Sequence, residues 1–97
     1  MRVISRKALR EFWESYPDSE GQLKAWHSEA KNAEWRTPAD VKGKYGNSSI
    51  LQDSRVVFNI CGNKYRLIVK INYKFQIVYI RFIGTHTQYD AIDAEAI

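Results

Sequence analysis

Two stretches in the first third of the chain carry apolar residues at helical spacing. In the first stretch these positions recur at i, i+3, i+4 and i+7, which places them on one face of a helix. They are Leu9, Phe12, Trp13 and Tyr16. The pattern predicts a helix from about Arg6 to Tyr16, with Ser5 as its N-cap and Pro17 as its end.

The second stretch keeps this spacing over residues 20 to 34. Its apolar positions are Leu23, Trp26, Ala30 and Ala33. Asp18 and Ser19 offer a cap, so we expect a second helix that runs to about Glu34. Because only a tight turn at Pro17 separates the two helices, they should pack as an antiparallel hairpin with Trp13 and Trp26 in the core.

From residue 55 onward the apolar positions alternate, as they do in β-strands. Val56, Phe58 and Ile60 indicate one strand, and the Gly62-Asn63 pair suits the positive φ angles of a hairpin turn. The next strand has Tyr65, Leu67, Val69, Ile71 and Tyr73 on one face. Its other face is basic and consists of Arg66, Ile68, Lys70 and Asn72.

The remaining segments complete the predicted fold. After a turn near Lys74, the segment Phe75 to Ile83 is apolar on both faces except at Gln76 and Arg81, which predicts a largely covered strand. Residues 1–4 form a possible first strand, and the loop 35–53 contains a possible short helix from Pro38 to about Lys44. We therefore expect one α+β domain over residues 1–97. Two N-terminal helices pack on a small antiparallel β-sheet, made of a short first strand and a three-stranded meander.

Composition limits the compartment and the kinds of site. Cys61 is the only cysteine among 97 residues, so neither an intramolecular disulfide nor a thiolate zinc site is expected. This favours a reducing, cytoplasmic location. No apolar run approaches the roughly 20 residues that span a bilayer, so we expect no membrane insertion.

Positive charge is concentrated in one region of the chain. Residues 41–89 contain eight Lys or Arg and one Asp, whereas residues 1–40 are balanced at seven of each sign and residues 90–97 contain three acidic residues. Such a basic region is typical of a surface that binds a polyanion. A solvated basic sheet face is the alternative explanation.

The candidate chemistry is restricted to Arg, Lys, His and Tyr. His27 and His86 are the only histidines and neither has a carboxylate cluster beside it, so we predict no metal site and no cofactor. The phosphate-binding loop, the dinucleotide-binding glycine pattern and the nucleophile elbow are all missing from the sequence.

These four residue types suffice for RNA cleavage by attack of a 2′-hydroxyl on the adjacent phosphate, because the nucleophile belongs to the substrate. The protein must supply a base, an acid and cations around the transition state. Arg66 and Arg81 are candidates for the cationic clamp, and His86 and Tyr89 for proton transfer.

A turn at Lys74 would bring the two arginines close to opposite positions on neighbouring strands, where they could share one phosphate. Alternatively, Arg66 and Arg81 are solvated strand residues, or they pair with Asp53 or Asp90.

Several runs of the sequence resemble one known family. They are Val57–Leu67, Val78–Arg81 and Thr85–Asp90, together with Ile4–Leu9 and the positions Trp35, Pro38, Asp40 and Lys42. This order of residues resembles the HigB family of bacterial toxins over nearly the whole chain. The resemblance implies a RelE-like toxin of a type II toxin-antitoxin system. Such a toxin is an endoribonuclease, or mRNA interferase, that cleaves mRNA, commonly at the ribosome. A cognate HigA-type antitoxin would hold it inactive.

The resemblance also implies site residues. The family's recurrent polar positions fall on Asn59, Asn63, Arg66, His86 and Tyr89, and Arg81 falls where RelE-like toxins tend to carry a basic residue. We therefore predict catalytic roles for Arg66, Arg81, His86 and Tyr89, and RNA binding by Asn59, Asn63, Lys64, Lys70 and Lys42. His86 is the preferred general base, with Lys64 as the alternative.

Two other functions fit the same residues. A non-catalytic RNA- or DNA-binding module would use the same basic sheet face. A plain interaction protein would instead bind its partner through the aromatic helices.

Overall fold

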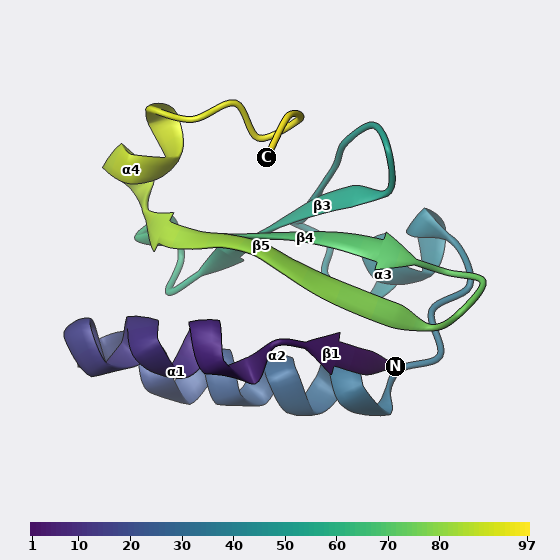
Figure 1. Ribbon diagram of the computed structural model, residues 1–97, viewed down its shortest axis with the longest axis horizontal. Coiled ribbons are helices and arrows are strands. Elements are labelled where there is room, and N and C mark those ends of the chain that lie inside the picture. The colour runs from purple at the N-terminus through teal and green to yellow at the C-terminus, as the bar shows by residue number, and fades with distance from the viewer.

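Five strands form one mixed sheet at the centre of the molecule (Figure 1). They are seen in a computed structural model that covers residues 1–97. The strands are β1 (Arg2–Ile4), β2 (Ser49–Ile50), β3 (Arg55–Ile60), β4 (Tyr65–Asn72) and β5 (Ile77–Thr85), and their order across the sheet is β1-β5-β4-β3-β2. The predicted α+β class is confirmed, and β3, β4 and β5 form the predicted antiparallel meander.

Two features of the sheet differ from the prediction. β1 pairs with β5 in parallel, so the sheet is not wholly antiparallel. β2 lies in the segment that was expected to be a loop, and it adds a fifth strand beside β3. Both strands are only two or three residues long. In so short a segment the neighbouring strands, rather than its own residue pattern, decide the pairing.

Two helices cover one face of the sheet (Figure 1). α1 (Arg6–Ser15) and α2 (Glu20–Asn32) are joined by the 3₁₀ turn η1 (Pro17–Ser19) and run in opposite directions, as predicted. α3 (Pro38–Lys44) is the predicted short helix. It begins with a capping box in which the Thr37 hydroxyl accepts from the Asp40 N–H and the Asp40 carboxylate accepts from the Thr37 N–H. None of the helices has both the length and the apolar content that a bilayer crossing requires.

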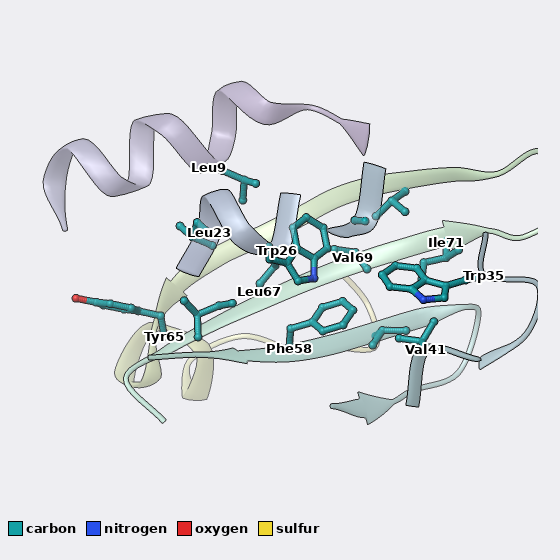
Figure 2. Close-up of a cluster of buried hydrophobic side chains, with 14 of the residues drawn as sticks. Leu9, Leu23, Trp26, Trp35, Val41, Phe58, Tyr65, Leu67, Val69 and Ile71 are labelled. Carbon is teal, nitrogen blue, oxygen red and sulfur yellow. The ribbon is translucent and has the colours of Figure 1, made fainter. Parts of the chain in front are cut away.

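The core lies between these helices and the sheet (Figure 2). Its fully buried members include Leu9 of α1, Leu23 and Trp26 of α2, Phe58 of β3, and Leu67 and Val69 of β4. The rings of Trp26 and Phe58 meet edge to face, with centroids 5.4 Å apart. Full burial of a large apolar side chain stabilises a fold by roughly 1.5–3 kcal/mol. The apolar faces of β4 and α2 therefore pack together in one core. Trp13 and Trp26, the two tryptophans that were predicted to be core residues, are both buried.

A short helix and the C-terminal segment lie over the opposite face of the sheet (Figure 1). The helix is α4 (His86–Asp90), and residues 91–97 follow it. Arg55 Nε donates to the main-chain oxygen of Ile97 at 2.9 Å, and Val57 and Ile68 of this face are buried. We call this side the outer face. It is partly covered, which the sequence pattern did not predict.

The β3–β4 turn differs from the prediction, whereas the β4–β5 turn lies near Lys74 as predicted but is longer than expected. Between β3 and β4 the positive φ angles belong to Cys61 (54°) and Gly62 (67°), so the left-handed pair begins one residue earlier than expected. Between β4 and β5 the turn comprises residues 73–76, and Gln76 has a φ of 57°. Phe75 therefore belongs to the turn, and it is 66% exposed.

β5 is less covered than predicted and is irregular in the middle. Tyr79 is 36% exposed. Val69 is opposite Ile80 whereas Ile68 is opposite Phe82, so Arg81 is the extra residue of a β-bulge. The bulge shifts the register of everything that follows it in β5.

Replacement of a core residue of β4 should destabilise the whole fold. We expect Leu67→Ala, at a fully buried position, to lower the free energy of unfolding by roughly 2–5 kcal/mol, because it leaves a cavity between α2 and the sheet. Urea unfolding measures this change. Phe75→Ala is the control and should change the free energy by no more than about 0.5 kcal/mol, since that ring is mostly in solvent. Equal effects of the two substitutions would contradict this account of the core.

Candidate active site

α4 begins where β5 ends and carries two of the predicted site residues, His86 and Tyr89. Thr85 is its N-cap. The Thr85 hydroxyl accepts from the Gln88 N–H at 3.1 Å, and Gln88 Oε1 accepts from the Thr85 N–H at 2.9 Å. This capping box satisfies backbone donors at the start of a helix of only 5 residues, and it holds α4 at the end of the sheet.

Gly84 allows α4 to approach the sheet closely. A Cβ atom at this position would lie 2.5 Å from Cζ of Phe82 and 2.7 Å from Oε1 of Gln88. Contacts this short do not occur, so any other residue would displace the Phe82 ring or the capping Gln88. The lack of a side chain at Gly84 therefore leaves room for the Phe82 ring and for the capping Gln88 as they are placed here.

Arg66 lies beside α4 on the outer face. In the sheet it is opposite Gly84 of β5 and Asn59 of β3. Its Nη1 donates to the main-chain oxygen of Asn63 at 3.1 Å, and its Cζ lies 5.6 Å from the centroid of the Tyr89 ring. This distance is within the range of cation–π interactions. The structure therefore brings together Arg66, Tyr89 and the main chain of Asn63, and leaves most guanidinium N–H groups free for an anion.

His86 is anchored through its main chain and exposes its ring. Its N–H donates to the main-chain oxygen of Lys64 at 3.0 Å. Its Nδ1 lies 3.2 Å from Oδ2 of Asp90, and half of the side chain is exposed. A carboxylate at this nitrogen favours the tautomer with the proton on Nδ1, which leaves Nε2 as an acceptor.

Arg81 does not lie opposite Arg66, so the predicted near-opposition is wrong. Arg66 pairs with Gly84, three residues further along β5, which corresponds to about 10 Å along the strand. The four-residue turn and the bulge at Arg81 together cause this offset. Arg81 instead lines a groove of about 500 Å³ between β5 and α1, together with Phe12 and Tyr16. Neither arginine pairs with Asp53 or Asp90. Asp53 forms ion pairs with Arg55 and Lys70, and Asp90 lies beside His86 Nδ1.

Lys64 is held by a carboxylate from the helix layer. Its ammonium forms an ion pair with Oδ2 of Asp18, and the Tyr65 hydroxyl donates to Oδ1 of the same carboxylate at 2.5 Å. The hydrogen bond and charge of Asp18 raise the pKa of Lys64, which keeps the ammonium protonated. Hydrogen bonds from Lys64 and Tyr65 lower the pKa of Asp18. The interaction connects η1 to the start of β4.

The other predicted RNA-binding residues are dispersed. Asn59 lies beside Arg66, and its side chain donates to the main-chain oxygen of Asn47 at 3.2 Å. Lys42 of α3 donates to the main-chain oxygen of Ser48. Lys70 is four residues from Arg66 on the same face of β4, which corresponds to about 13 Å, and its ammonium lies 3.8 Å from the Asp53 carboxylate.

Sequence reasoning missed four residues that shape this site, namely Asp18, Gly84, Gln88 and Asp90. The Thr85-x-x-Gln88 spacing is a capping-box signal and could have predicted α4. Asp18 carried no such signal, because it is 46 residues away from Lys64 in the sequence.

Comparison with known proteins identifies the family. A family model described as "HigB_toxin, RelE-like toxic component of a toxin-antitoxin system" matches residues 19–92. The chain belongs to the HigB toxin family. The RelE-like α+β fold and the toxin class implied by the resemblance are thereby confirmed, and an antitoxin is the partner that such a system requires.

Curated relatives of the HigB family match over nearly the full length. The "mRNA interferase toxin HigB" of Escherichia coli (strain K12) is 29% identical over 96 residues, which cover 97% of this chain and 92% of the relative. The "mRNA interferase HigB" of Shigella flexneri has the same identity and coverage. The "mRNA interferase HigB" of Escherichia coli O6:H1 is 23% identical over 94 residues, with 95% and 91% coverage.

The Asp18–Lys64 ion pair should make stability depend on pH at both extremes. The pKa of Asp18 lies below its ordinary value of 3.8, so the contribution is complete above that pH and is lost as the pH falls through the lowered pKa. The pKa of Lys64 lies above 10.5, so the contribution is complete below that pH and is lost as the pH rises through the raised pKa. Asp18→Asn should make both slopes of melting temperature against pH shallower.

Thermal melts from acid to alkaline pH measure these slopes. Asp93→Asn is the control, because it removes the same charge from a residue that accepts from the Glu95 N–H, whereas the ion pair of Lys64 is with Asp18. Unchanged slopes in Asp18→Asn would show that the pair does not contribute to stability.

Proposed function

We propose that this protein is an endoribonuclease that cleaves mRNA through attack of a 2′-hydroxyl on the adjacent phosphate, without a metal ion. The observation that carries the proposal is the position of Arg66 against the Tyr89 ring, with His86 on the same short helix. A cation for the phosphate, a ring that can stack on a base and a group that can take a proton thus lie at one end of the sheet. The names of the curated relatives, which are mRNA interferases, support the same activity.

Arg66 binds the scissile phosphate in this mechanism. A guanidinium stays charged and grips two phosphate oxygens at once. Its contact with the main-chain oxygen of Asn63 fixes the side chain before the substrate arrives. Since negative charge accumulates on the phosphate oxygens as the 2′-oxygen attacks, a cation fixed in this way stabilises the transition state more than the ground state.

His86 is the general base, and Asp90 orients it. Nε2 takes the proton of the 2′-hydroxyl while the 2′-oxygen forms a bond to phosphorus and the bond to the 5′-oxygen breaks. The leaving oxygen takes a proton from an acid, for which Tyr89 is the nearest candidate on α4. The products are a 2′,3′-cyclic phosphate and a 5′-hydroxyl. Lys64 is the less suitable base, because Asp18 raises its pKa.

The remaining basic and amide residues bind RNA around this centre. Asn59 and Asn63 lie next to Arg66, and Arg81 contacts a phosphate further along β5. Lys70 and Lys42 act at a distance from the cleaved bond. We further propose that the protein acts in the cytoplasm on mRNA bound to ribosomes, and that a HigA-type antitoxin inhibits it by covering this basic end of the sheet with an acidic segment.

The experiment that tests this function adds the purified protein to translating ribosomes with a defined messenger and maps new 5′ ends. A ribonuclease of this kind produces new ends, and it needs no divalent metal beyond what the ribosomes require. A non-catalytic RNA-binding module would bind the same RNA without new ends. A plain interaction protein would do neither.

Arg66→Ala should reduce cleavage by about 10²-fold or more, because it removes a donor that acts on the developing charge. It should also abolish growth inhibition on expression. Arg10→Ala is the matched control, since Arg10 lies on the exposed side of α1 in an ion pair with Glu14. Thermal melts of both variants exclude unfolding as the cause. Full toxicity of Arg66→Ala at equal expression would remove Arg66 from the mechanism.

His86→Gln should lower single-turnover cleavage by about 10²-fold with nearly unchanged RNA affinity, because glutamine keeps hydrogen-bonding capacity but cannot take a proton. Tyr89→Phe distinguishes the two roles of the ring. A small effect indicates stacking alone, whereas a loss comparable with that of His86→Gln indicates proton transfer by the hydroxyl. A wild-type rate in His86→Gln would assign the base to another residue.

A further inference from the structure

The largest exposed aromatic side chains gather at the β4–β5 hairpin, at the end of the sheet remote from α4 (Figure 1). Phe75 in the turn is 66% exposed and Tyr79 of β5 is 36% exposed. Phe75 packs on no core residue. Its aromatic contact is with the Lys74 ammonium, 5.5 Å from the ring centroid. Exposed apolar side chains that gather at one place, rimmed by polar residues, are typical of a surface that binds a ligand.

A groove of about 430 Å³ is lined in part by Tyr79 and Lys74, and Phe75 directly follows Lys74 in the turn. It is lined by Lys70, Asn72, Lys74 and Tyr79, and on its other side by Asp53 and Ser54. Lys70 and Tyr79 are directly opposite each other in neighbouring strands, so both side chains are on the outer face. The groove therefore combines two ammonium groups, a side-chain amide and an aromatic ring.

The charge of the groove is positive in spite of Asp53. Oδ2 of Asp53 lies 3.2 Å from Nη1 of Arg55 and 3.8 Å from the Lys70 ammonium. Because Arg55 is nearly buried and is the closer partner, its guanidinium neutralises the carboxylate. Lys70 lies further from this carboxylate than Arg55 does and Lys74 forms no ion pair, so the groove suits a ligand with more than one negative charge.

The groove and the Arg66 site share one face of the sheet. Arg66 and Lys70 are four residues apart on a strand without a bulge, or about 13 Å. The C-terminal segment is held over β3 by the contact between Arg55 and Ile97, which leaves the β5 side of this face accessible at Tyr79. One extended strand can therefore contact both places.

We propose that this hairpin groove is a second binding site for the substrate RNA strand, in which Lys70 and Lys74 bind phosphates and Phe75 and Tyr79 stack on unpaired bases. The proposal rests on the proposed function, because it assigns the ligand as the strand that is cleaved at Arg66. Stacking on aromatic rings beside cationic side chains is the general means of binding single strands without sequence preference. The site adds affinity and takes no part in bond breaking.

The first test measures RNA affinity against salt concentration. The probe is a roughly 20-nucleotide RNA with 2′-O-methyl groups, which is longer than the sites of about 4–16 nucleotides that single-strand binding folds occupy. It cannot be cleaved, because its 2′-oxygens are blocked. The double variant Lys70→Ala/Lys74→Ala should bind it more weakly, with a slope of log affinity against log salt that is smaller by about 1.4, or ~0.7 for each lost phosphate contact.

The matched control is Lys7→Ala/Lys31→Ala, which removes the same charge from the helix layer on the opposite side of the sheet. Its salt slope should stay at the wild-type value. Equal losses in the two double variants would mean that only net charge matters, and would overturn the site.

Asp53→Asn should have the opposite effect. It removes the one negative charge of the groove, so RNA affinity should rise and the salt slope should increase. Asparagine tolerates the positive φ of 62° at this position and still accepts from Arg55, so the local fold should persist. A fall in affinity with an unchanged melting temperature would contradict the proposal.

Phe75→Ala tests the stacking. Because base stacking on one ring typically accounts for about 5- to 150-fold in affinity, the variant should bind the long RNA more weakly by a factor in that range. A trinucleotide substrate spans the Arg66 site alone, so its cleavage rate should be the same in wild type and Phe75→Ala.

The outcomes separate this inference from the proposed function. If the wild type cleaves RNA and the groove variants bind long RNA as tightly as the wild type does, the groove proposal is wrong and the ribonuclease proposal stands. If RNA binding depends on the groove residues but no RNA is cleaved, the proposed ribonuclease activity is wrong and the groove remains an RNA-binding site. An effect of the groove variants that appears only with ribosomes, and not with free RNA, would overturn the assignment to the substrate strand.

Discussion

The turn between β3 and β4 connects three parts of the molecule through Lys64. The ammonium is paired with Asp18 at the corner of the helix hairpin, and the main-chain oxygen accepts the N–H of His86 at the start of α4. The preceding residue, Asn63, accepts from Arg66. Helix layer, sheet and α4 therefore meet at one turn, and the relative positions of the catalytic candidates depend on it.

This dependence matters because α4 is too short to persist alone. A helix of 5 residues gains little from its own hydrogen bonds, so its position comes from contacts with the rest of the fold. The capping pair Thr85 and Gln88, the missing side chain at Gly84 and the contact of Tyr89 with Arg66 supply these contacts. The candidate site is thus built on a short helix and is supported by β4, an 8-residue central strand with buried residues on both faces.

The sheet separates two different surfaces. One face is packed against α1 and α2 in the apolar core, and the other carries Arg66, Lys70 and Tyr79 beside α4 and the C-terminal segment. A strand of RNA on the outer face would meet cations and rings at both ends of β4. Since its backbone charge is repeated along the strand, two separated cationic positions can bind one molecule without any change in the fold.

Much of this arrangement was predictable from local patterns. The helical spacing around Trp13 and Trp26, and the alternation of Leu67 and Val69 with Arg66 and Lys70, each depend on which face of one element is apolar, and the structure has these faces as predicted. The cap of α3 at Thr37 is likewise local, because donor and acceptor lie within one turn. Of the candidate site, the sequence indicated the residue types and the end of β5 from which His86 and Tyr89 emerge.

The distances between these residues could not be predicted in the same way. Whether Arg81 faces Arg66 depends on a bulge in β5 and on a turn of four residues, and one extra residue in a strand moves every later partner. The partners of Lys64 and His86 come from Asp18 and Asp90, and β1 and β2 are too short to specify their own pairing. The sequence by itself determined the periodic elements, their apolar faces and the basic character of one of them, because these are properties of near neighbours. Only the tertiary structure decided register, the covering of the outer face and the contacts of the site, because these arise where segments far apart in the chain compete for the same space.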